Sequence, residues 1–292
     1  MTRLLAVALL ALPAVAAAQV DAQCAGLPKP ADYSEELQQD FLQNYFGLGS
    51  TYSAIHAPIP HEPGHGSIGV DLNVLPPLGC RRRMVLDWTK TEHTNKTPVL
   101  PRPRVSFAFP AIGKLVPYAS FAYVPPIDLG GTRTVVLSGE IGAGMALGEA
   151  EKLQVGARFH ATSMKAIADI AGAFSSSEPD VLDYYQANSL GLDLSAGYDL
   201  GAVTPYVSAG VVDVSSIFLV GDDGILVNNY HPYAGPAFGL GADGLVGARF
   251  RWGAELYAAP GGHSRPAEEA VQAGFGEAGH LYTARLRVAV EL

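Results

Sequence analysis

The chain has 292 residues, with 28 acidic and 19 basic side chains and a formal net charge of -9 at pH 7. This acidic balance argues against nucleic acid as a partner, because nucleic-acid-binding surfaces are basic. Hydrophobic residues make up 48% of the chain and charged residues only 16%, with a mean hydropathy of +0.17. That is too little charge for the outer face of an ordinary soluble barrel or sandwich.

Residues 1–18 are predicted to be a secretory signal peptide. Arg3 precedes an apolar run over 4–18 that ends in three alanines, and cleavage is expected after Ala18. The run is shorter than the roughly 20 residues that span a bilayer. Since no other stretch is a candidate spanning helix, a membrane-spanning form of this chain would have to be a β-barrel.

An amphipathic helix is predicted over 32–46, within an N-terminal segment, 19–46, that we expect on the periplasmic side. Asp32 and Glu35 resemble a capping box, and apolar residues recur at helical spacing up to Tyr45. Three placements remain open for this helix: a plug in the barrel mouth, a lid outside it, or a loosely docked tail.

Residues 47–292 show the period-2 alternation of β-strands, which predicts a single antiparallel transmembrane β-barrel. Twelve strands are expected, with ten or fourteen as alternatives. Their connections alternate between short and long, as in barrels with short periplasmic turns and longer outer loops. The predicted segments are 47–55, 67–75, 82–89, 103–109, 114–123, 134–147, 151–163, 188–200, 203–216, 232–240, 244–258 and 280–292.

Turn lengths give two hairpin registers. The two-residue turn at 201–202 fits the apolar faces of 188–200 and 203–216. A three-residue turn at 148–150 would pair Glu140 with Arg158 and Ser138 with His160, all toward the lumen. Ser, His and Glu side by side suggest a lipid-modifying hydrolase as one alternative function, while a salt bridge in a polar interior is the structural explanation.

The last strand has a clear apolar face, which includes Leu286 and Val288, and a polar face with Arg285 and Arg287. We expect the first strand to close onto it, because an unpaired edge in lipid leaves backbone groups without hydrogen bonds. Arg249 and Arg251 are predicted to point inward at a similar depth.

Inward charges are therefore predicted to line the lumen and contact a solute. With only Glu255 and Glu291 near the four arginines, water or an anionic solute is the expected partner, and helix carboxylates such as Glu35 and Glu36 are the alternative. The predicted lining residues are Arg249, Arg251, Arg285, Arg287, Glu255, Glu140, Arg158 and Asp193.

Two strings match known site motifs without their structural context. His61 to His65 reads HEPGH, but Pro63 and Gly64 break the helix that a zinc protease needs, so we expect an extracellular turn. Residues 239–244 match GxGxxG, but a strand follows where a nucleotide site needs a helix, so a glycine-rich periplasmic turn is expected. Neither string indicates a cofactor or a metal.

The chain has two cysteines, and export to an oxidising compartment favours a disulfide between Cys24 and Cys80. Both are expected on the periplasmic side, Cys80 in a short turn after 67–75. Such a bond would hold the 32–46 helix at the barrel mouth.

Pro-Tyr pairs at 117–118 and 205–206 each follow a short turn, and 232–233 repeats the pair. This pattern resembles the strand opening of bacterial outer-membrane β-barrel families, including porin-like and hydrophobic-solute barrels. The C-terminal segment resembles their barrel-assembly signal, although it ends on Leu292 where an aromatic residue is usual. The resemblance implies a Gram-negative outer membrane, with membrane lipid, lipopolysaccharide and the barrel-assembly machinery as partners.

The expected function is that of a porin-like, passive channel for small solutes. A structural or adhesive barrel with a filled lumen is the main alternative, since the width of the lumen decides whether side chains or water fill it. The lipid-modifying hydrolase is the third.

Overall fold

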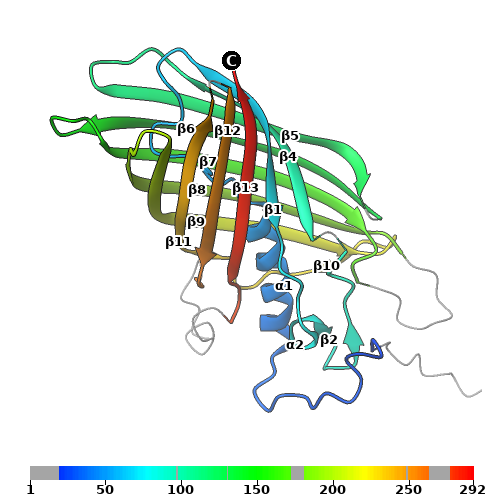
Figure 1. Ribbon diagram of the computed structural model, residues 1–292. Coiled ribbons are helices and arrows are strands. Elements are labelled where there is room, and N and C mark those ends of the chain that lie inside the picture. Colours follow the sequence, from blue (N-terminus) through cyan, green and yellow to red (C-terminus); the bar gives the residue numbers. More distant parts are fainter. Residues whose placement is uncertain (1–19, 97, 130, 172–180, 248, 263–276) are drawn as a thin grey trace, which may run out of the picture.

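The computed structural model describes residues 20–292 except 97, 130, 172–180, 248 and 263–276. The predicted signal peptide lies outside the described residues. Ten strands of the described chain form one closed antiparallel barrel in which each strand pairs with the next along the chain and β13 closes onto β1 (Figure 1). These strands are β1 (Gly66–Val74), β4 (Val99–Ala108), β5 (Leu115–Leu129), β6 (Thr132–Leu147), β7 (Leu153–Ala168), β8 (Asp183–Tyr198), β9 (Val203–Val220), β11 (Ala234–Val246), β12 (Phe250–Ala259) and β13 (Leu281–Glu291).

The remaining elements lie at one end of the barrel or inside it. Helix α1 (Glu35–Ser50) is in the lumen, and α2 (Cys80–Arg83) precedes a small hairpin of β2 (Met84–Val85) and β3 (Lys90–Thr91). Strand β10 (Ile225–Val227) folds back on the end of β9 and stands outside the ten-stranded barrel. None of the described helices has the length and apolar character needed to cross a membrane.

The barrel has ten strands, the lower alternative, and the expected count of twelve is not confirmed. Segment 82–89 forms the end of α2, β2 and a turn. Segment 47–55 is the end of α1 and an extended stretch whose residues are all buried. A strand of the barrel wall exposes one of its faces, so the complete burial of 47–55 places it inside the barrel.

The hairpin registers were partly predictable. The β8–β9 register follows the two-residue turn at 201–202 as expected, with Gly197 opposite Tyr206. In β6–β7, however, Glu140 is opposite His160 and Ser138 is opposite Thr162, so the predicted pairing is wrong. The turn spans 148–152, because Gly148 and Glu151 both have positive φ and Leu147 pairs with Leu153.

The turn predicted at 241–243 is also displaced. These residues, with the GxGxxG string, lie inside β11, which continues until Val246 pairs with Phe250. Gly247, with φ at 64°, begins the actual turn.

The outer face of the barrel is apolar over most of its height. Leu190, Leu192 and Leu194 of β8 are exposed, as are Leu286 and Val288 of β13. Polar outward residues gather toward one end, where Lys165, Asn188, Asp213 and Ser215 are exposed on adjacent strands. The barrel therefore presents an apolar band with a polar extension at that end.

The two ends differ in their connections. Ser67 of β1 pairs with Glu291, so β1 begins where β13 ends. The turns after β4, β6, β8 and β11 lie at this end, which we call the short-turn end. The connections after β1, β7, β9 and β12 are longer and lie at the opposite loop end, where β5 and β6 are joined by two residues only. In Figure 1 the C-terminus marks the short-turn end, and α2 and β2 mark the loop end.

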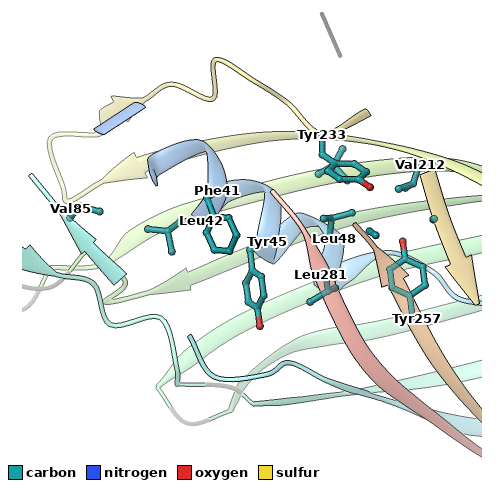
Figure 2. Close-up of a cluster of buried hydrophobic side chains, with 12 residues drawn as sticks. Phe41, Leu42, Tyr45, Leu48, Val85, Val212, Tyr233, Tyr257 and Leu281 are labelled. Atoms are coloured by element: carbon teal, nitrogen blue, oxygen red, sulfur yellow. The ribbon is translucent and has the colours of Figure 1, made fainter. Parts of the chain in front are cut away.

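Helix α1 enters the barrel from the loop end. It begins after Ser34, whose Oγ accepts a hydrogen bond from Leu37 N, and it extends four residues beyond the predicted end at residue 46. Phe41, Tyr45 and Leu48 face the inner wall of β9, β12 and β13 (Figure 2). Gly47 allows the close approach, because a Cβ there would lie 2.3 Å from Cγ1 of Val214. Of the three placements left open, α1 occupies the one inside the barrel, but it enters from the loop end and not from the side of the short turns, where segment 19–46 was expected.

Candidate functional site

Residues 51–61 continue from α1 as extended chain through the rest of the lumen, and we call α1 together with 51–61 the luminal plug. Hydrogen bonds at several positions join this extended segment to the wall. The Tyr52 hydroxyl lies 2.9 Å from Ser120 Oγ, Ala57 N donates to Asp243 over 3.2 Å, and Ile59 N donates to Gln154 over 3.3 Å. The plug therefore occupies the lumen from the loop end to the short-turn end.

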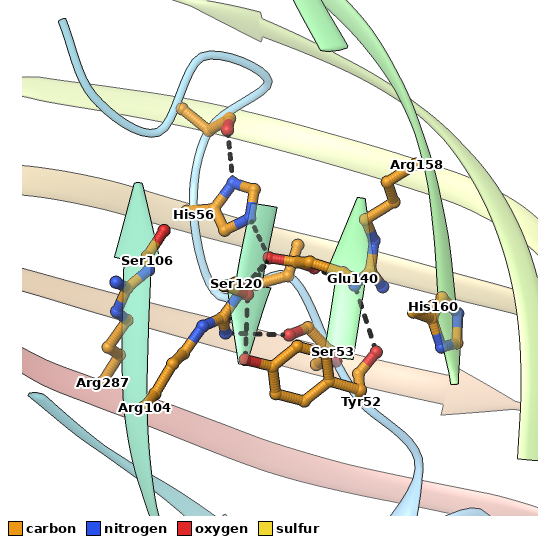
Figure 3. Close-up of polar contacts among 12 residues, drawn as sticks. Tyr52, Ser53, His56, Arg104, Ser106, Ser120, Glu140, Arg158, His160 and Arg287 are labelled. Atoms are coloured by element: carbon orange, nitrogen blue, oxygen red, sulfur yellow. Dashed lines mark hydrogen bonds and ion pairs between the residues drawn. The ribbon is translucent and has the colours of Figure 1, made fainter. Parts of the chain in front are cut away.

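A buried carboxylate joins the plug to the wall at mid-height. Glu140 accepts hydrogen bonds from Arg158 Nη1 at 2.8 Å, from Ser120 Oγ at 2.7 Å, and from Arg104 Nη2 (Figure 3). His56 Nε2 of the plug lies 3.0 Å from the same carboxylate. Glu140 is 3% exposed, so side chains and not bulk water fill this level of the lumen.

Arg158 extends the network to β8, where it bonds Asp193 Oδ2, and His160 Nε2 lies 3.4 Å from that oxygen. The structure thus brings together Glu140, Arg158 and Asp193 from the predicted set. Ser138 Oγ is bonded to Thr162 Oγ1 instead of His160. The Ser, His and Glu arrangement expected for a hydrolase does not form.

The arginines of β12 and β13 lie at different depths. Arg251, near the short-turn end, pairs with Asp243 at 2.7 Å and with Glu291. Arg285, deeper in the lumen, donates to Thr51 Oγ1 over 3.0 Å and stacks 3.8 Å from the centre of the Tyr257 ring. Arg287 lies between them and donates to Ser67 Oγ over 2.8 Å.

Two of the expectations for charged residues are corrected. Arg249 is exposed in the turn before β12 and does not point into the lumen, because β12 begins only at Phe250. Glu35 accepts hydrogen bonds from the backbone of 86 and 87, so it does not neutralise the arginines. Glu255 points inward as expected and accepts a bond from Tyr206 over 3.0 Å.

Several inward charges were not predicted from the sequence. Arg102 and Arg104 of β4 are each 1% exposed, and Asp71 of β1 lies 3.1 Å from Arg104. Asp243 lies inside β11 and not in a turn. Period-2 alternation in β4 carries the signal, since the residues beside the two arginines, including Pro101 and Pro103, fall on the outward face.

His61 fixes the plug at the short-turn end. Its Nδ1 lies 3.0 Å from both Glu291 carboxylate oxygens, and its Nε2 lies 3.0 Å from Ser106 Oγ. The chain of contacts from Glu291 through His61 to Ser106 has the order of a catalytic triad, but Ser106 and His61 are each 2% exposed. A substrate has no access to this serine, so the set acts as a structural contact.

The HEPGH string does not form a metal pair. His61 is buried, whereas Glu62 to His65 form an exposed turn. That turn lies at the short-turn end, next to the start of β1, and not among the outer loops as the sequence suggested.

Two hollows flank Phe46 of α1 near the loop end, and we call them together the mouth cavity. The first, about 80 Å³, lies between α1 and the wall of β6 to β8 and reaches Met164 and Tyr185. The second, about 170 Å³, lies under the β2–β3 hairpin and reaches Val85, Val220 and Val227. Phe46, Thr94 and Ile170 border both. The lining is largely apolar.

No protein-family profile and no curated protein matches the chain. Several solved structures do match. The translocator domain of the autotransporter NalP from Neisseria meningitidis matches at 11% identity and TM-score 0.35, covering 79% of this chain and 88% of that one. An outer membrane channel from Pseudomonas putida F1 matches at 12% identity and TM-score 0.37, covering 82% of this chain and 99% of that one. The toluene transporter TbuX from Ralstonia pickettii matches at 11% identity and TM-score 0.33, covering 80% of this chain and 91% of that one.

These structures are outer-membrane β-barrels, and the predicted resemblance to such proteins is confirmed at that level. No single family is assignable. At these identities and TM-scores the likeness carries no argument about what this chain binds.

A disulfide joins the N-terminal segment to α2, which precedes the β2–β3 hairpin over the larger hollow. Cys24 and Cys80 form a disulfide with their Cα atoms 5.4 Å apart. Cys80 follows β1, so the bond lies at the loop end. Its expected place among the short turns is therefore wrong, because that placement counted a barrel strand at 82–89.

Proposed function

We propose that this chain is a bacterial outer-membrane barrel that takes up small apolar solutes through its loop end, with the luminal plug as its gate. The observation that carries the proposal is the mouth cavity, an apolar hollow at the entrance to a lumen that the chain itself fills. A cavity of about 150 Å³ lined by apolar side chains is known to bind benzene, and the larger hollow measures about 170 Å³.

The outer face supports a membrane location. Exposed leucines and valines surround the barrel, and a monomeric soluble protein rarely exposes an apolar surface of that extent. Short turns at one end and longer connections at the other are typical of outer-membrane barrels, whose turns face the periplasm. We therefore assign the short-turn end to the periplasm and the mouth cavity to the outside.

The test combines binding with uptake. Ala171 is 2% exposed and borders the larger hollow, so Ala171→Phe should fill that space and reduce benzene binding by the purified protein at least tenfold, about 1.4 kcal/mol. Cells expressing this variant should accumulate labelled benzene more slowly than cells with the native chain. Ala157→Phe, which places the same ring on the lipid face of β7, is the control. Equal binding by all three proteins would exclude the mouth cavity as the solute site.

A structural barrel with a permanently filled lumen is the second candidate. The buried network around Glu140 favours it, because the plug histidine, two wall arginines and a wall serine all bond this one carboxylate. Such a barrel would bind no solute and would give no uptake above that of cells lacking the chain. The same uptake experiment therefore separates the two candidates.

A further inference from the structure

The polar groups of the mouth cavity indicate which apolar compounds it accepts. We propose that the cavity binds a small neutral compound that carries one hydroxyl group, held by Glu92 and Thr94. This inference rests on the proposed function, since it names the class of solute that the same cavity recognises.

Two buried oxygens lack partners among the described residues. Glu92 Oε2 and Thr94 Oγ1 are both inaccessible to solvent and neither makes a hydrogen bond. Glu92 borders the larger hollow, and Thr94 borders both. Buried polar atoms of native proteins are nearly always satisfied, so two exceptions in residues that border a cavity call for an explanation.

The surroundings of the two oxygens match a hydroxyl group. Thr94 Oγ1 donates one hydrogen bond and accepts others, and a carboxyl oxygen accepts. A ligand hydroxyl has both capacities, so it satisfies Thr94 and Glu92 together. A plain hydrocarbon would leave both oxygens unpaired.

Charge argues against an ionic head group. Lys90 Nζ lies 3.6 Å from Glu92 Oε1, and Lys90 itself is 2% exposed. A ligand ammonium would be repelled by this buried ammonium, and a ligand carboxylate would compete with Glu92 Oε1 for it. Either ion would also lose its hydration in an apolar space, at a large cost in free energy.

Burial raises the pKa of Glu92, which lies in the connection between β3 and β4 outside the barrel wall, to about 8. At neutral pH its carboxyl group is mostly protonated. A protonated carboxyl both donates and accepts, which suits a hydroxyl partner equally well.

The test uses four ligands with one skeleton: toluene, benzyl alcohol, benzylamine and benzoate, each titrated against the purified full chain. We expect benzyl alcohol to bind and its affinity to fall about tenfold in Glu92→Leu and in Thr94→Val, the loss of about one hydrogen bond. Toluene should bind both variants at least as well as the native chain. Retained toluene binding then shows that the variants are folded.

Thr89→Val is the matched control. Thr89 is exposed in the turn between β2 and β3 and borders neither hollow, so loss of its hydroxyl should leave benzyl alcohol binding unchanged. Glu92→Gln, which keeps the shape and an acceptor oxygen, should lose less affinity than Glu92→Leu.

The outcomes separate the two proposals. If toluene binds and benzyl alcohol is insensitive to Glu92→Leu and Thr94→Val, the hydroxyl inference is overturned while the uptake function stands. Tighter binding of benzoate or benzylamine than of benzyl alcohol also overturns it. If no ligand of the four binds the native chain, both proposals fail.

Discussion

Glu140 connects more of the lumen than any other single carboxylate described above. It bonds two arginines from different strands and the plug histidine. Glu140→Gln removes the charge and leaves Arg104 with Asp71 and Arg158 with Asp193. Breaking a buried ion pair costs about 3–5 kcal/mol. Because both arginines keep a carboxylate partner, we expect the free energy of unfolding to fall by about 3 kcal/mol.

Denaturant unfolding of the protein in detergent measures this loss. Glu149→Gln, in the exposed turn after β6, serves as the control and should change stability by less than about 0.5 kcal/mol. Similar shifts for the two variants would mean that the Glu140 network does not stabilise the barrel.

Glu92 gives stability a pH dependence. Burial raises its pKa from 4.5 to about 8, so between these values the unfolded chain has lost a proton that the folded chain keeps. The folded state then binds more protons, and the free energy of unfolding falls as pH rises through this window. Stability from this group is complete below about pH 4.5 and is lost at high pH.

We expect Glu92→Gln to remove that slope. Melting temperatures of the native chain and the variant, compared at several pH values across the window, isolate the contribution of this one group. Parallel curves for the two proteins would contradict a raised pKa at Glu92.

At the residue scale, period-2 alternation was sufficient to predict the inward direction of some charged side chains and not of others. Arg285 and Arg287 alternate with apolar residues on an uninterrupted strand, so their inward direction was predictable. Arg102 and Arg104 alternate in the same way, but with the prolines beside them the predicted strand began only at residue 103, whereas β4 begins at Val99. Their partners were not predictable either, because Asp71 and Glu140 meet them only through the register and the closure of the barrel.

At the element scale, the faces of β12 are testable. Ala254 is opposite Leu286 on the outward face, so Ala254→Arg places a charge in the apolar band. The expected cost is about 2–4 kcal/mol near the bilayer midplane and about 0–1 kcal/mol near an interface. Gln186→Arg, in the polar outward region of β8, is the control and should show the smaller value.

Refolding into lipid vesicles under denaturant gives both values. A loss at Gln186 as large as that at Ala254 would contradict the proposed limits of the apolar band. Gly253 of β12 is buried, and a Cβ there would lie 2.4 Å from Ile55 O, so Gly253→Arg would displace the plug.

The disulfide reports which end faces outward. If the loop end is outside, a thiol reagent that cannot cross the outer membrane should label Cys24 and Cys80 on intact cells after mild reduction. Labelling that requires permeabilised cells would invert the assignment. The bond spans 56 residues in sequence, and closing a loop of that length contributes on the order of 4 kcal/mol through chain entropy.

Elements were predictable wherever a strand had one apolar and one polar face, as β6 to β9 and β13 do. Segment 47–55 shows the limit of that rule. Its Tyr52 and Ala54 share a parity that fits a strand, but the plug is buried on all sides. Alternation of polar and apolar residues indicates a strand only when its two faces lie in different surroundings. A segment inside the lumen is in contact with protein on every side.

For the whole molecule, the central question is whether the plug closes the barrel to ions. Wall contacts hold the extended part of the plug at Ser53, His56 and His61. We expect the native chain to show no steady conductance in planar bilayers, since a lumen filled with side chains conducts no ions. The combined variant Ser53→Gly, His56→Ala and His61→Ala removes these contacts and should produce open intervals.

His65→Ala tests the specificity of that effect. His65 belongs to the same stretch of chain, but its side chain is exposed beyond the wall contacts, so this variant should remain closed like the native protein. Steady native currents would show that residues 51–61 do not seal the lumen, and a closed triple variant would show that the hydrophobic seat of α1 against β9, β12 and β13 is sufficient to keep it shut. Conductance of the three proteins at matched insertion levels therefore decides whether the plug is a gate held by polar contacts.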